Sequence, residues 1–360
     1  MAYQVGVFNG DYIGPEIMAE ALKILDVIAK KHNHQFDLTF LEASGEAFDK
    51  YGEHLPQHTL DKAAQCDALL KGPFGGPPEE LNHPKWAGVE KGAILPLRKH
   101  FNLYTNLRET QVFDALRDLS PIKWDIVRGI NVLIVRELTS GIYFGPKNNQ
   151  VVDGERESSD LEVYRESEIR RIAKKAFEYA QNRNRKVTLV AKSNVLTSSV
   201  LWREVTAEVA KDYADVTLDY MHVDNASMQL ILNPRQFDVI LTNNIFGDIL
   251  SDEASVLSGS IGLFPSASLG DTTLGLYEPI HGSAPSIAGK NIANPISTIL
   301  SVALMLRYSF ALHEEAASIE RAVAEVLSKG HRTVDLVGPG QESANVVGTR
   351  EMGDLIANEI

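Results

Sequence analysis

The 360-residue sequence has little cysteine, no excess of basic residues and no long apolar run. Its single cysteine, Cys66, excludes an internal disulfide framework and is typical of a reducing compartment. The formal net charge of −13 argues against the basic stripe that nucleic-acid binding requires. The longest uncharged stretches, Ala254–Gly270 and Asn291–Leu306, are interrupted by polar residues and are too short to span a membrane. Because Met1–Gly10 lacks the build of a secretory signal, we expect a cytoplasmic protein.

Two nucleotide-binding motifs are also absent. Neither G-x-G-x-x-G nor G-x-x-x-x-G-K-[ST] occurs, so neither a standard Rossmann site nor a P-loop is predicted. A loop rich in Gly, Ser and Pro does occur at Glu278–Pro285, followed by Gly289 and Asn294. Free backbone N–H groups in such a loop can bind a phosphate or adenosine without a Rossmann turn. Taken alone, the segment is only a loop.

The sequence does contain β-branched apolar runs that alternate with amphipathic segments. Strands are predicted at Gln4–Phe8, Ala68–Lys71, Val132–Arg136, Val187–Ala191, Val216–Val223 and Phe237–Thr242. Helices are predicted around Ile17–Ile28, at Glu168–Arg183 and at His313–Ser328, and the polar segment Lys147–Asp160 is expected to form an exposed arm or hairpin. This alternation is typical of an α/β protein with a largely parallel or mixed sheet, and the length allows two domains.

Asp248 and Asp252 are the clearest candidates for a metal site. A strand is expected to end near Thr242 and a helix to begin near Asp248. Residues four apart lie on one helical face, and two clustered carboxylates repel unless a cation lies between them. Such oxygen ligands favour Mg²⁺ or Mn²⁺. The alternative is one carboxylate at a helix N-terminus and one solvated aspartate. Asp224, which follows another strand, could be a third ligand or a helix cap, and alone favours the cap.

Three arginines suit an anionic substrate. Arg98 and Arg108 flank a segment with strand and turn character, and Arg136 ends a predicted strand, where ligands collect in α/β sheets. Arginine forks bind carboxylates in bidentate fashion, so three converging arginines would suit a dianionic or trianionic acid. The alternative for each arginine alone is a surface salt bridge.

Tyr143 and Lys192 are candidates for proton transfer. Lys192 ends the predicted strand Val187–Ala191, and partial desolvation there favours a role as a base. The alternatives are a core tyrosine with a satisfied hydroxyl and a lysine that extends its ammonium to the surface.

Nine segments, taken together and in order, resemble the β-hydroxyacid oxidative decarboxylases, the family of isopropylmalate, isocitrate, homoisocitrate and tartrate dehydrogenases. The segments are Gly10–Glu16, Leu95–Arg98, Asn106–Arg108, Val135–Thr139, Gly141–Gly145, Lys192–Leu196, Val223–Ala226, Asn244–Asp252 and Glu278–Pro285. They span nearly the whole chain, and their order is far more specific than any one of them.

The resemblance implies a two-domain α/β fold that shares one large mixed sheet and is not a Rossmann fold. Residues 1–103 and 259–360 would form the first, cofactor-binding domain. Residues 104–258 would form the second domain, which carries the metal and substrate residues and forms the dimer. Because the family completes its active site across the dimer interface, a homodimer with shared sites is implied.

The resemblance also implies roles for the candidate residues. Arg98, Arg108 and Arg136 would hold the substrate carboxylates. The metal would be bound by Asp248 and Asp252, together with Asp224 of the partner subunit. Lys192 would take the proton of the substrate hydroxyl while hydride leaves to the nicotinamide. After loss of CO₂, Tyr143 would protonate the enolate.

Cofactor binding follows from the same resemblance. The dinucleotide would lie against Ile13, Pro73, Phe74, Glu90, Asn194, Glu278, His281, Gly282, Ser283, Ala284, Ser286 and Asn294. Members that use NAD normally have Asp where this chain has Ser286, which weakens the preference for NAD over NADP. NAD is still the expected cofactor, and a need for K⁺ stays open. The chain departs further from the family at Tyr12, where glycine is usual, and at Gly72-Pro73-Phe74 in place of Gly-Ser-Val.

The expected substrate is set by Ile94 and Leu95. Isocitrate-type relatives have Ser and Asn in this segment to meet a third carboxylate, which an apolar wall would leave without partners. The resemblance therefore favours 3-isopropylmalate, an intermediate of leucine biosynthesis. The alternatives are another 3-alkylmalate, tartrate, malate or homoisocitrate as substrate, a catalytically silent regulatory paralogue, and a metal-dependent hydrolase that uses only Asp248 and Asp252.

Overall fold

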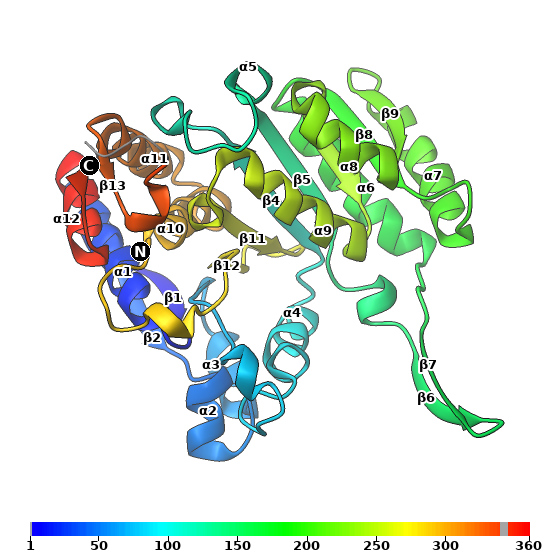
Figure 1. Ribbon diagram of the computed structural model, residues 1–360, viewed down its shortest axis with the longest axis horizontal. Coiled ribbons are helices and arrows are strands. Elements are labelled where there is room, and N and C mark those ends of the chain that lie inside the picture. Colours follow the sequence, from blue (N-terminus) through cyan, green and yellow to red (C-terminus); the bar gives the residue numbers. More distant parts are fainter. Residues whose placement is uncertain (1, 339–344) are drawn as a thin grey trace. The chain divides into compact units, whose positions relative to one another are not determined.

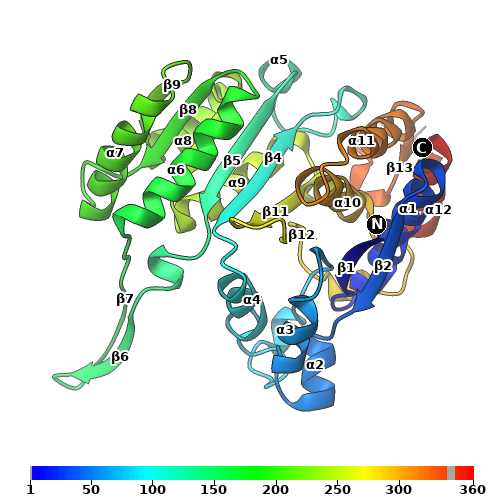
Figure 2. The same cartoon turned by 180° about the vertical axis from the view of Figure 1, so that it is seen from behind.

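The computed structural model of the chain describes residues 2–338 and 345–360 and shows a mixed α/β fold (Figures 1 and 2). Ten strands form one large mixed sheet in the order β2-β1-β3-β12-β11-β4-β5-β10-β8-β9. The predicted fold class is therefore confirmed. No helix in the described ranges is both long enough and apolar enough to cross a membrane.

The strands of the large sheet are β1 (Ala2–Phe8), β2 (Gln35–Phe40), β3 (Ala68–Lys71), β4 (Thr105–Gln111), β5 (Asn131–Glu137), β8 (Lys186–Ala191), β9 (Thr217–His222), β10 (Val239–Thr242), β11 (Pro265–Leu269) and β12 (Gly275–Pro279). Two small sheets pair β6 (Lys147–Val152) with β7 (Glu155–Asp160), and β13 (His331–Arg332) with β14 (Asn345–Val346). The helices are α1 (Gly14–His32), α2 (Ser44–Tyr51), α3 (Gln57–Ala63), α4 (Leu95–His100), α5 (Trp124–Val127), α6 (Glu166–Gln181), α7 (Thr197–Val209), α8 (Val223–Leu232), α9 (Asn244–Ser255), α10 (Ile296–Tyr308), α11 (His313–Ser328) and α12 (Thr349–Glu359).

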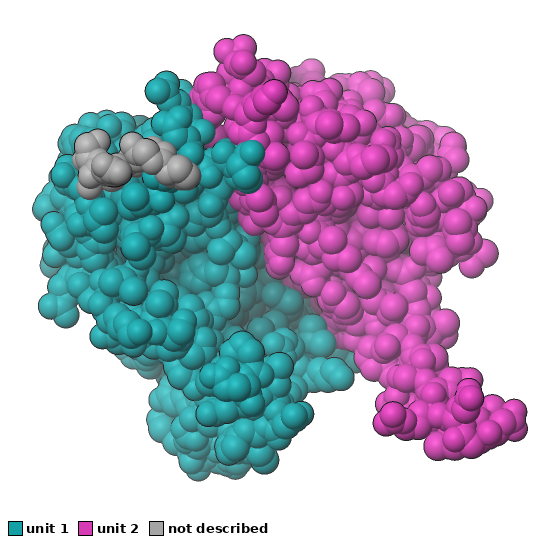
Figure 3. All heavy atoms as spheres, viewed as in Figure 1, with its two compact units in different colours: residues 1–103, 113–121, 258–360 teal, residues 104–112, 122–257 magenta. Residues whose placement is uncertain are grey.

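The chain divides into two compact units (Figure 3). Unit 1 contains residues 1–103, 113–121 and 258–360, and unit 2 contains residues 104–112 and 122–257. Segment 113–121 thus belongs to unit 1, whereas the predicted boundaries assign it to the second domain. The division into folding domains at 103/104 and 258/259 stays a prediction.

In unit 1, strands β1, β2, β3 and β12 are parallel, and β11 is antiparallel to β12. Helix α1 buries one apolar face, including Ile17, Ile24 and Ile28, as its 3.6-residue period predicts. Helix α10 was not predicted. It is mostly apolar and is buried on all sides along Ile296–Leu306, and a helix of that kind has no amphipathic period to reveal it.

In unit 2, strand β4 is antiparallel to β5, and strands β5, β10, β8 and β9 are parallel. Alternate side chains of this sheet, such as Ile134 and Ile240, pack with Leu230 of α8 and Leu250 of α9 in one core cluster. Because the strands are parallel, their carboxyl ends lie at one edge of the sheet. The predicted residues Arg136, Lys192, Asp224 and Asp248 all lie at or shortly after these strand ends.

All six predicted strands and three predicted helices are present, with ends that differ by a few residues. The segment Lys147–Asp160 forms the exposed β6–β7 hairpin, as predicted. One boundary was wrong: α9 begins at Asn244 and not near Asp248. The side chain of Asn243 accepts a hydrogen bond from the N–H of Phe246 and caps the helix earlier than expected.

Candidate active site

Two carboxylates on α9 form the centre of the candidate site in unit 2. Asp248 and Asp252 lie one helical turn apart, and Arg108 of β4 contacts both. Its Nη1 donates to Oδ1 of Asp252 at 2.7 Å, and its Nη2 lies 3.5 Å from Oδ1 of Asp248. The same Nη1 also donates to the hydroxyl of Ser251 at 2.7 Å. The guanidinium therefore offsets the repulsion between the two carboxylates.

Arg136 supplies a second positive charge from the end of β5. It is almost fully buried, and its Nη1 donates to Oδ1 of Asp248 at 2.6 Å. Its Nε and Nη2 both donate to the side-chain oxygen of Asn244, whose own amide donates to the carbonyl of Ser140. A Cβ on Gly247 would lie 2.7 Å from Cβ of Arg136, so only glycine lets α9 pack this closely on the arginine.

Tyr143 completes this cluster, which we call the α9 cluster: Arg108, Arg136, Tyr143, Asp248 and Asp252. It ends the short helix η4 (Gly141–Tyr143), and its hydroxyl donates to Oδ2 of Asp248 at 2.8 Å. Burial and the hydrogen bond to Asp248 raise the pKa of Tyr143 to about 12. The phenol is therefore protonated at neutral pH and can serve as a proton donor.

Lys192 and Asp224 form a separate pair in unit 2. They follow the neighbouring parallel strands β8 and β9, in which Ala191 lies opposite His222. The Lys192 ammonium donates to Oδ1 of Asp224, and this hydrogen bond is the main cause that lowers the pKa of Asp224. The pair is accessible, since the side chain of Asp224 is 63% exposed. Asp224 lies in the first turn of α8, after the cap residue His222, so it is not the cap itself.

A divalent metal fits the donor set of the α9 cluster only in part. Two carboxylates are present, but among the described residues no group of three or more His, Cys, Asp or Glu could hold a metal ion. A complete site built on Asp248 and Asp252 therefore needs at least one ligand from elsewhere. The implied role of Asp224 of the partner subunit stays a prediction.

In unit 1, three loops meet at the carboxyl ends of β1, β3 and β12. The N–H of Asp11 donates to the carbonyl of Pro73 at 2.8 Å, and the N–H of Ile13 donates to the carbonyl of Ser283 at 3.1 Å. The hydroxyl of Ser283 donates to the carbonyl of Gly75 at 2.8 Å. Ile13, Pro73, Phe74 and the predicted cofactor residues of segment 278–286 are thus brought together. Asn194 lies in unit 2.

Asp11 ties these loops to α2. Its carboxylate accepts hydrogen bonds from the hydroxyl of Ser44 and from the N–H groups of Gly45 and Gly75. Burial raises the pKa of Asp11, although these three donors favour the ionised form. Tyr12 adopts a left-handed backbone with φ of 49°, which explains why glycine is usual there, and its ring lies 5.5 Å from that of Trp86.

Lys71 is a functional candidate that the sequence analysis missed. It ends the apolar strand β3 with its side chain 2% exposed, and its ammonium lies 2.6 Å from Oε2 of Glu278. Arg98 donates to Oε1 of the same carboxylate at 2.9 Å. The sequence feature that could have identified Lys71 is a single charged residue at the end of a buried strand, just before a loop rich in Gly and Pro.

The two cations keep Glu278 ionised. Burial alone would raise its pKa, but the charges of Lys71 and then Arg98 outweigh burial and lower the pKa to about 2. Because this value lies below the ordinary 4.5, the interaction stabilises the fold above about pH 4.5, and that stabilisation is lost as the pH falls toward 2. The Nε of Arg98 is buried and has no hydrogen-bond partner within the described ranges, so the guanidinium retains donor capacity for an anion.

The loop after β12 has features that suit a dinucleotide. His281 has a buried Nε2 with no hydrogen-bond partner in the part of the chain that the structure describes, and burial lowers the pKa of its ring. Gly282 is exposed with open space around its Cα. Ser286, in the short helix η9 (Pro285–Ile287), is exposed as well. Asn294 is buried, and its amide donates to Asp335.

The remaining predicted residues differ in accessibility. Glu90 is exposed at the start of a π-helical turn, η2 (Glu90–Ile94), which leads into α4. Ile94 is half-buried against a core cluster of unit 1, and Leu95 is also half-buried. Phe74 is 9% exposed and belongs to that same cluster, so its side chain contributes to the core and its backbone lies on the loop.

Comparisons with known proteins agree with this arrangement. Residues 4–356 match the family model described as isocitrate/isopropylmalate dehydrogenase. The 3-isopropylmalate dehydrogenase of Carboxydothermus hydrogenoformans is 52% identical over 359 residues, which cover 99% of this chain and 95% of the relative. That of Haemophilus influenzae is 50% identical over 361 residues, covering 100% of this chain and 99% of the relative. The crystal structure of isocitrate dehydrogenase from Methylococcus capsulatus matches with a TM-score of 0.86 at 35% identity, over 99% of both chains.

The buried ion pairs of Glu278 make a testable contribution to stability. We expect Glu278→Gln to destabilise unit 1 by roughly 3–5 kcal/mol, because it leaves the ammonium of Lys71 buried without a counter-charge. The double variant Lys71→Met/Glu278→Gln should recover part of this loss. Chemical unfolding followed by circular dichroism measures both. Glu320→Gln is the matched control, since its pair with Arg307 is partly exposed and should contribute less than about 1 kcal/mol. A double variant no more stable than Glu278→Gln would contradict this account.

Proposed function

The chain belongs to the isocitrate/isopropylmalate dehydrogenase family, a family of decarboxylating dehydrogenases, and we propose that it acts on 3-isopropylmalate. The proposed reaction oxidises the C2 hydroxyl, releases CO₂ and forms 4-methyl-2-oxopentanoate while NAD is reduced. The α9 cluster is the observation that carries the proposal, because it combines anion-binding arginines, a protonated phenol and two carboxylates. The product would enter leucine biosynthesis, and the expected location is cytoplasmic.

The proposed metal ligands are Asp248 and Asp252, completed by the partner subunit's Asp224. Their oxygens suit Mg²⁺ or Mn²⁺. When bound, such an ion supplies Lewis-acid polarisation of the substrate oxygen at C2. Arg108 and Arg136 balance the two carboxylates through ion pairs. A cation at the carboxylates would take over this balance, so the guanidinium groups could turn to the substrate carboxylates.

Proton transfer is assigned to two side chains. Lys192, in its neutral form, would accept the C2 hydroxyl proton as hydride leaves C2 for the cofactor, which gives a 2-oxo acid. The bond between C3 and its carboxylate then breaks and CO₂ leaves with the electron pair remaining on an enolate. Tyr143 would donate its proton to C3, and its pKa of about 12 supports this role because the phenol is protonated before the step.

The substrate assignment rests on the segment of Ile94 and Leu95, and the similarity to 3-isopropylmalate dehydrogenases supports it further. Both side chains are half-buried and apolar. A branched alkyl group would be accommodated beside them, whereas the third carboxylate of isocitrate would lose its hydration without gaining a hydrogen-bond donor. Arg98 would hold a carboxylate through the donors that Glu278 does not occupy.

We propose that the protein forms a homodimer, because large apolar side chains are exposed at the adjacent helices α8 and α9. Helices α8 and α9 lie side by side, and large apolar side chains on them and directly after α9 are about half exposed or more, namely Met228, Leu232, Ile249 and Val256. An apolar surface of this kind on adjacent helices is typical of a protein interface. Association there would also bring in a second copy of the exposed Lys192–Asp224 pair, which the metal site of one chain lacks.

The first experiment is an initial-rate panel with Mg²⁺ or Mn²⁺, with and without K⁺. It combines 3-isopropylmalate, malate, tartrate, isocitrate and homoisocitrate with NAD and NADP. We expect kcat/KM for 3-isopropylmalate to exceed that for every other acid at least about tenfold. Isocitrate and homoisocitrate carry a third carboxylate, which would cost more than about 1.4 kcal/mol if left unpaired, and malate and tartrate lack the branched alkyl group that Ile94 and Leu95 would bury. NAD should be preferred, by a narrow margin because Ser286 does not repel a 2′-phosphate. A higher value for malate or tartrate would overturn the substrate proposal, and no turnover with any acid would favour the silent paralogue.

The second experiment separates the two proton transfers. Tyr143→Phe should slow the decarboxylation half of the reaction more than the oxidation half, by roughly 10²–10⁴-fold, because it removes the proton donor to C3. Lys192→Met should abolish hydride transfer. Single-turnover measurements of cofactor reduction and of CO₂ release report the two halves separately. Equal losses of both halves in Tyr143→Phe would refute its assigned role.

A third experiment tests the shared site. Lys192→Met chains and Asp252→Asn chains should each be inactive alone, and co-refolding them should restore up to about a quarter of the original activity, because half of randomly formed dimers contain one intact site. As a control, Lys192→Met mixed with Asp224→Asn should restore nothing, since both residues come from the same side of the interface. A mixture of the first two variants that stays inactive, while dimers form, would argue for sites within one chain.

A further inference from the structure

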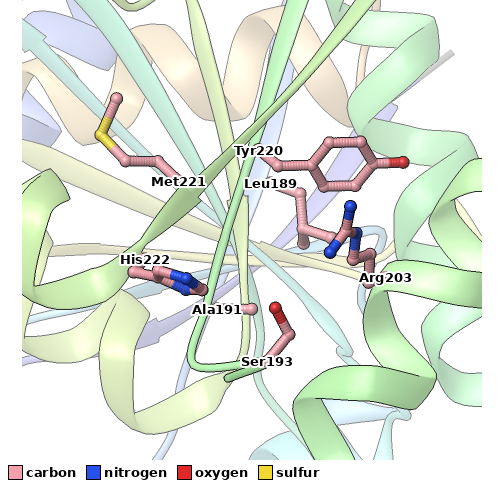
Figure 4. A pocket seen from close by; sticks show the side chains of 7 residues that line it. All are labelled: Leu189, Ala191, Ser193, Arg203, Tyr220, Met221 and His222. Atoms are coloured by element: carbon pink, nitrogen blue, oxygen red, sulfur yellow. The ribbon is translucent and has the colours of Figure 1, made fainter. Parts of the chain in front are cut away.

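A small cavity that is open to solvent lies in unit 2 beside strand β9 and helix α7, apart from the α9 cluster, and its residues Arg203, Tyr220 and His222 are exposed. Its volume is about 130 Å³, and it is lined by Leu189, Ala191, Ser193, Arg203, Tyr220, Met221 and His222. Figure 4 shows the side chains of Arg203, Ser193 and His222 around this one hollow. The chemistry assigned above to Lys192 and Asp224 does not use any of these seven residues.

Three of the four polar side chains of the cavity, Ser193, Arg203 and His222, have unused hydrogen-bonding capacity. Within the described residues, Arg203 has no carboxylate within 4.0 Å. Its guanidinium carbon lies 5.0 Å from the centre of the Tyr220 ring. The hydroxyl of Ser193 and the ring of His222 likewise have no hydrogen-bond partner in that part of the chain. Each of these groups can donate a hydrogen bond, and the Arg203 guanidinium can only donate.

None of the seven lining residues carries a carboxylate, and Arg203 contributes a guanidinium. Asp224 follows His222 by two residues and interacts with its ring electrostatically, and its carboxylate also pairs with Lys192. Glu204 lines a neighbouring hollow, shared with Ser193, Arg203 and Tyr220, and not this cavity.

We propose that this cavity binds a small tetrahedral oxyanion, with free inorganic phosphate as its ligand. A guanidinium presents paired N–H groups that match two oxygens of such an anion. Ser193 and His222 supply further donors from two other elements of the wall. The apolar side chains of Leu189 and Ala191 lie on the same face of the sheet as Tyr220 and His222 and exclude water from that part of the wall, which strengthens the charged hydrogen bonds. The limited volume favours the free anion over an organic phosphate.

The site is independent of the proposed dehydrogenase reaction, so its test does not depend on turnover. Phosphate binding to the full-length protein is measured by isothermal titration calorimetry with the parent, Arg203→Gln, Arg108→Gln and Arg321→Gln. Arg108→Gln reports any phosphate bound in the α9 cluster. Arg321 is the matched control, an exposed arginine of α11 that makes no ion pair in the described structure.

We expect two results that support the proposal. Arg203→Gln should raise the Kd for phosphate at this site at least about tenfold, because a bidentate charged contact is lost, while Arg108→Gln and Arg321→Gln leave this Kd unchanged. Crystals soaked in selenate should give an anomalous peak between Arg203 and Ser193. Unchanged phosphate binding in Arg203→Gln, or no selenate peak there, would overturn the proposal. Glycerol 2-phosphate that binds this site as tightly as phosphate would overturn the assignment of the free anion.

Discussion

The repulsion between Asp248 and Asp252 is the constraint on which the unit 2 site depends. Two carboxylates one turn apart on α9 are stable together only if positive charge lies near them. Arg136 at the end of β5 and Arg108 on the adjacent β4 supply that charge, and Tyr143 adds a hydrogen bond to Asp248. The same guanidinium groups would bind the substrate carboxylates. One set of positive charges would therefore both stabilise α9 and attract the substrate.

Unit 1 uses the opposite arrangement, in which one carboxylate lies between two cations. Glu278 is 6% exposed, so its ionisation depends on Lys71 and Arg98 together. With one cation alone, the pair would be neutral, and Arg98 would have little net charge to attract an anion. The second cation gives the group a net positive charge while satisfying Glu278. Burial therefore makes Lys71 as relevant to the function of Arg98 as to the stability of the fold.

Sequence patterns predicted most of the strands because periodicity and strand ends are local properties. They also predicted that Arg136, Lys192 and Asp224 follow strand ends, since the carboxyl ends of parallel strands share an edge. Local patterns could not predict partners. The hydrogen bonds of Arg136 to Asn244, and of Arg98 to Glu278, join residues more than one hundred positions apart. Lys71 was missed because a lysine at a strand end commonly reaches solvent, and only the packing around it shows that this one does not.

The Lys192–Asp224 pair links the proposed shared metal site to the proposed base. Asp224 is exposed, and its hydrogen bond from Lys192 lowers its pKa, so it is ionised well below neutral pH. An ionised carboxylate that faces solvent can bind a metal ion. Here, however, it also accepts a hydrogen bond from the ammonium of Lys192, the proposed base. If Asp224 instead coordinates a metal ion bound by Asp248 and Asp252 of another copy, its charge is shared with that ion and its attraction for the ammonium weakens. On this account, assembly of the metal site and the release of Lys192 from its contact with Asp224 would be one event.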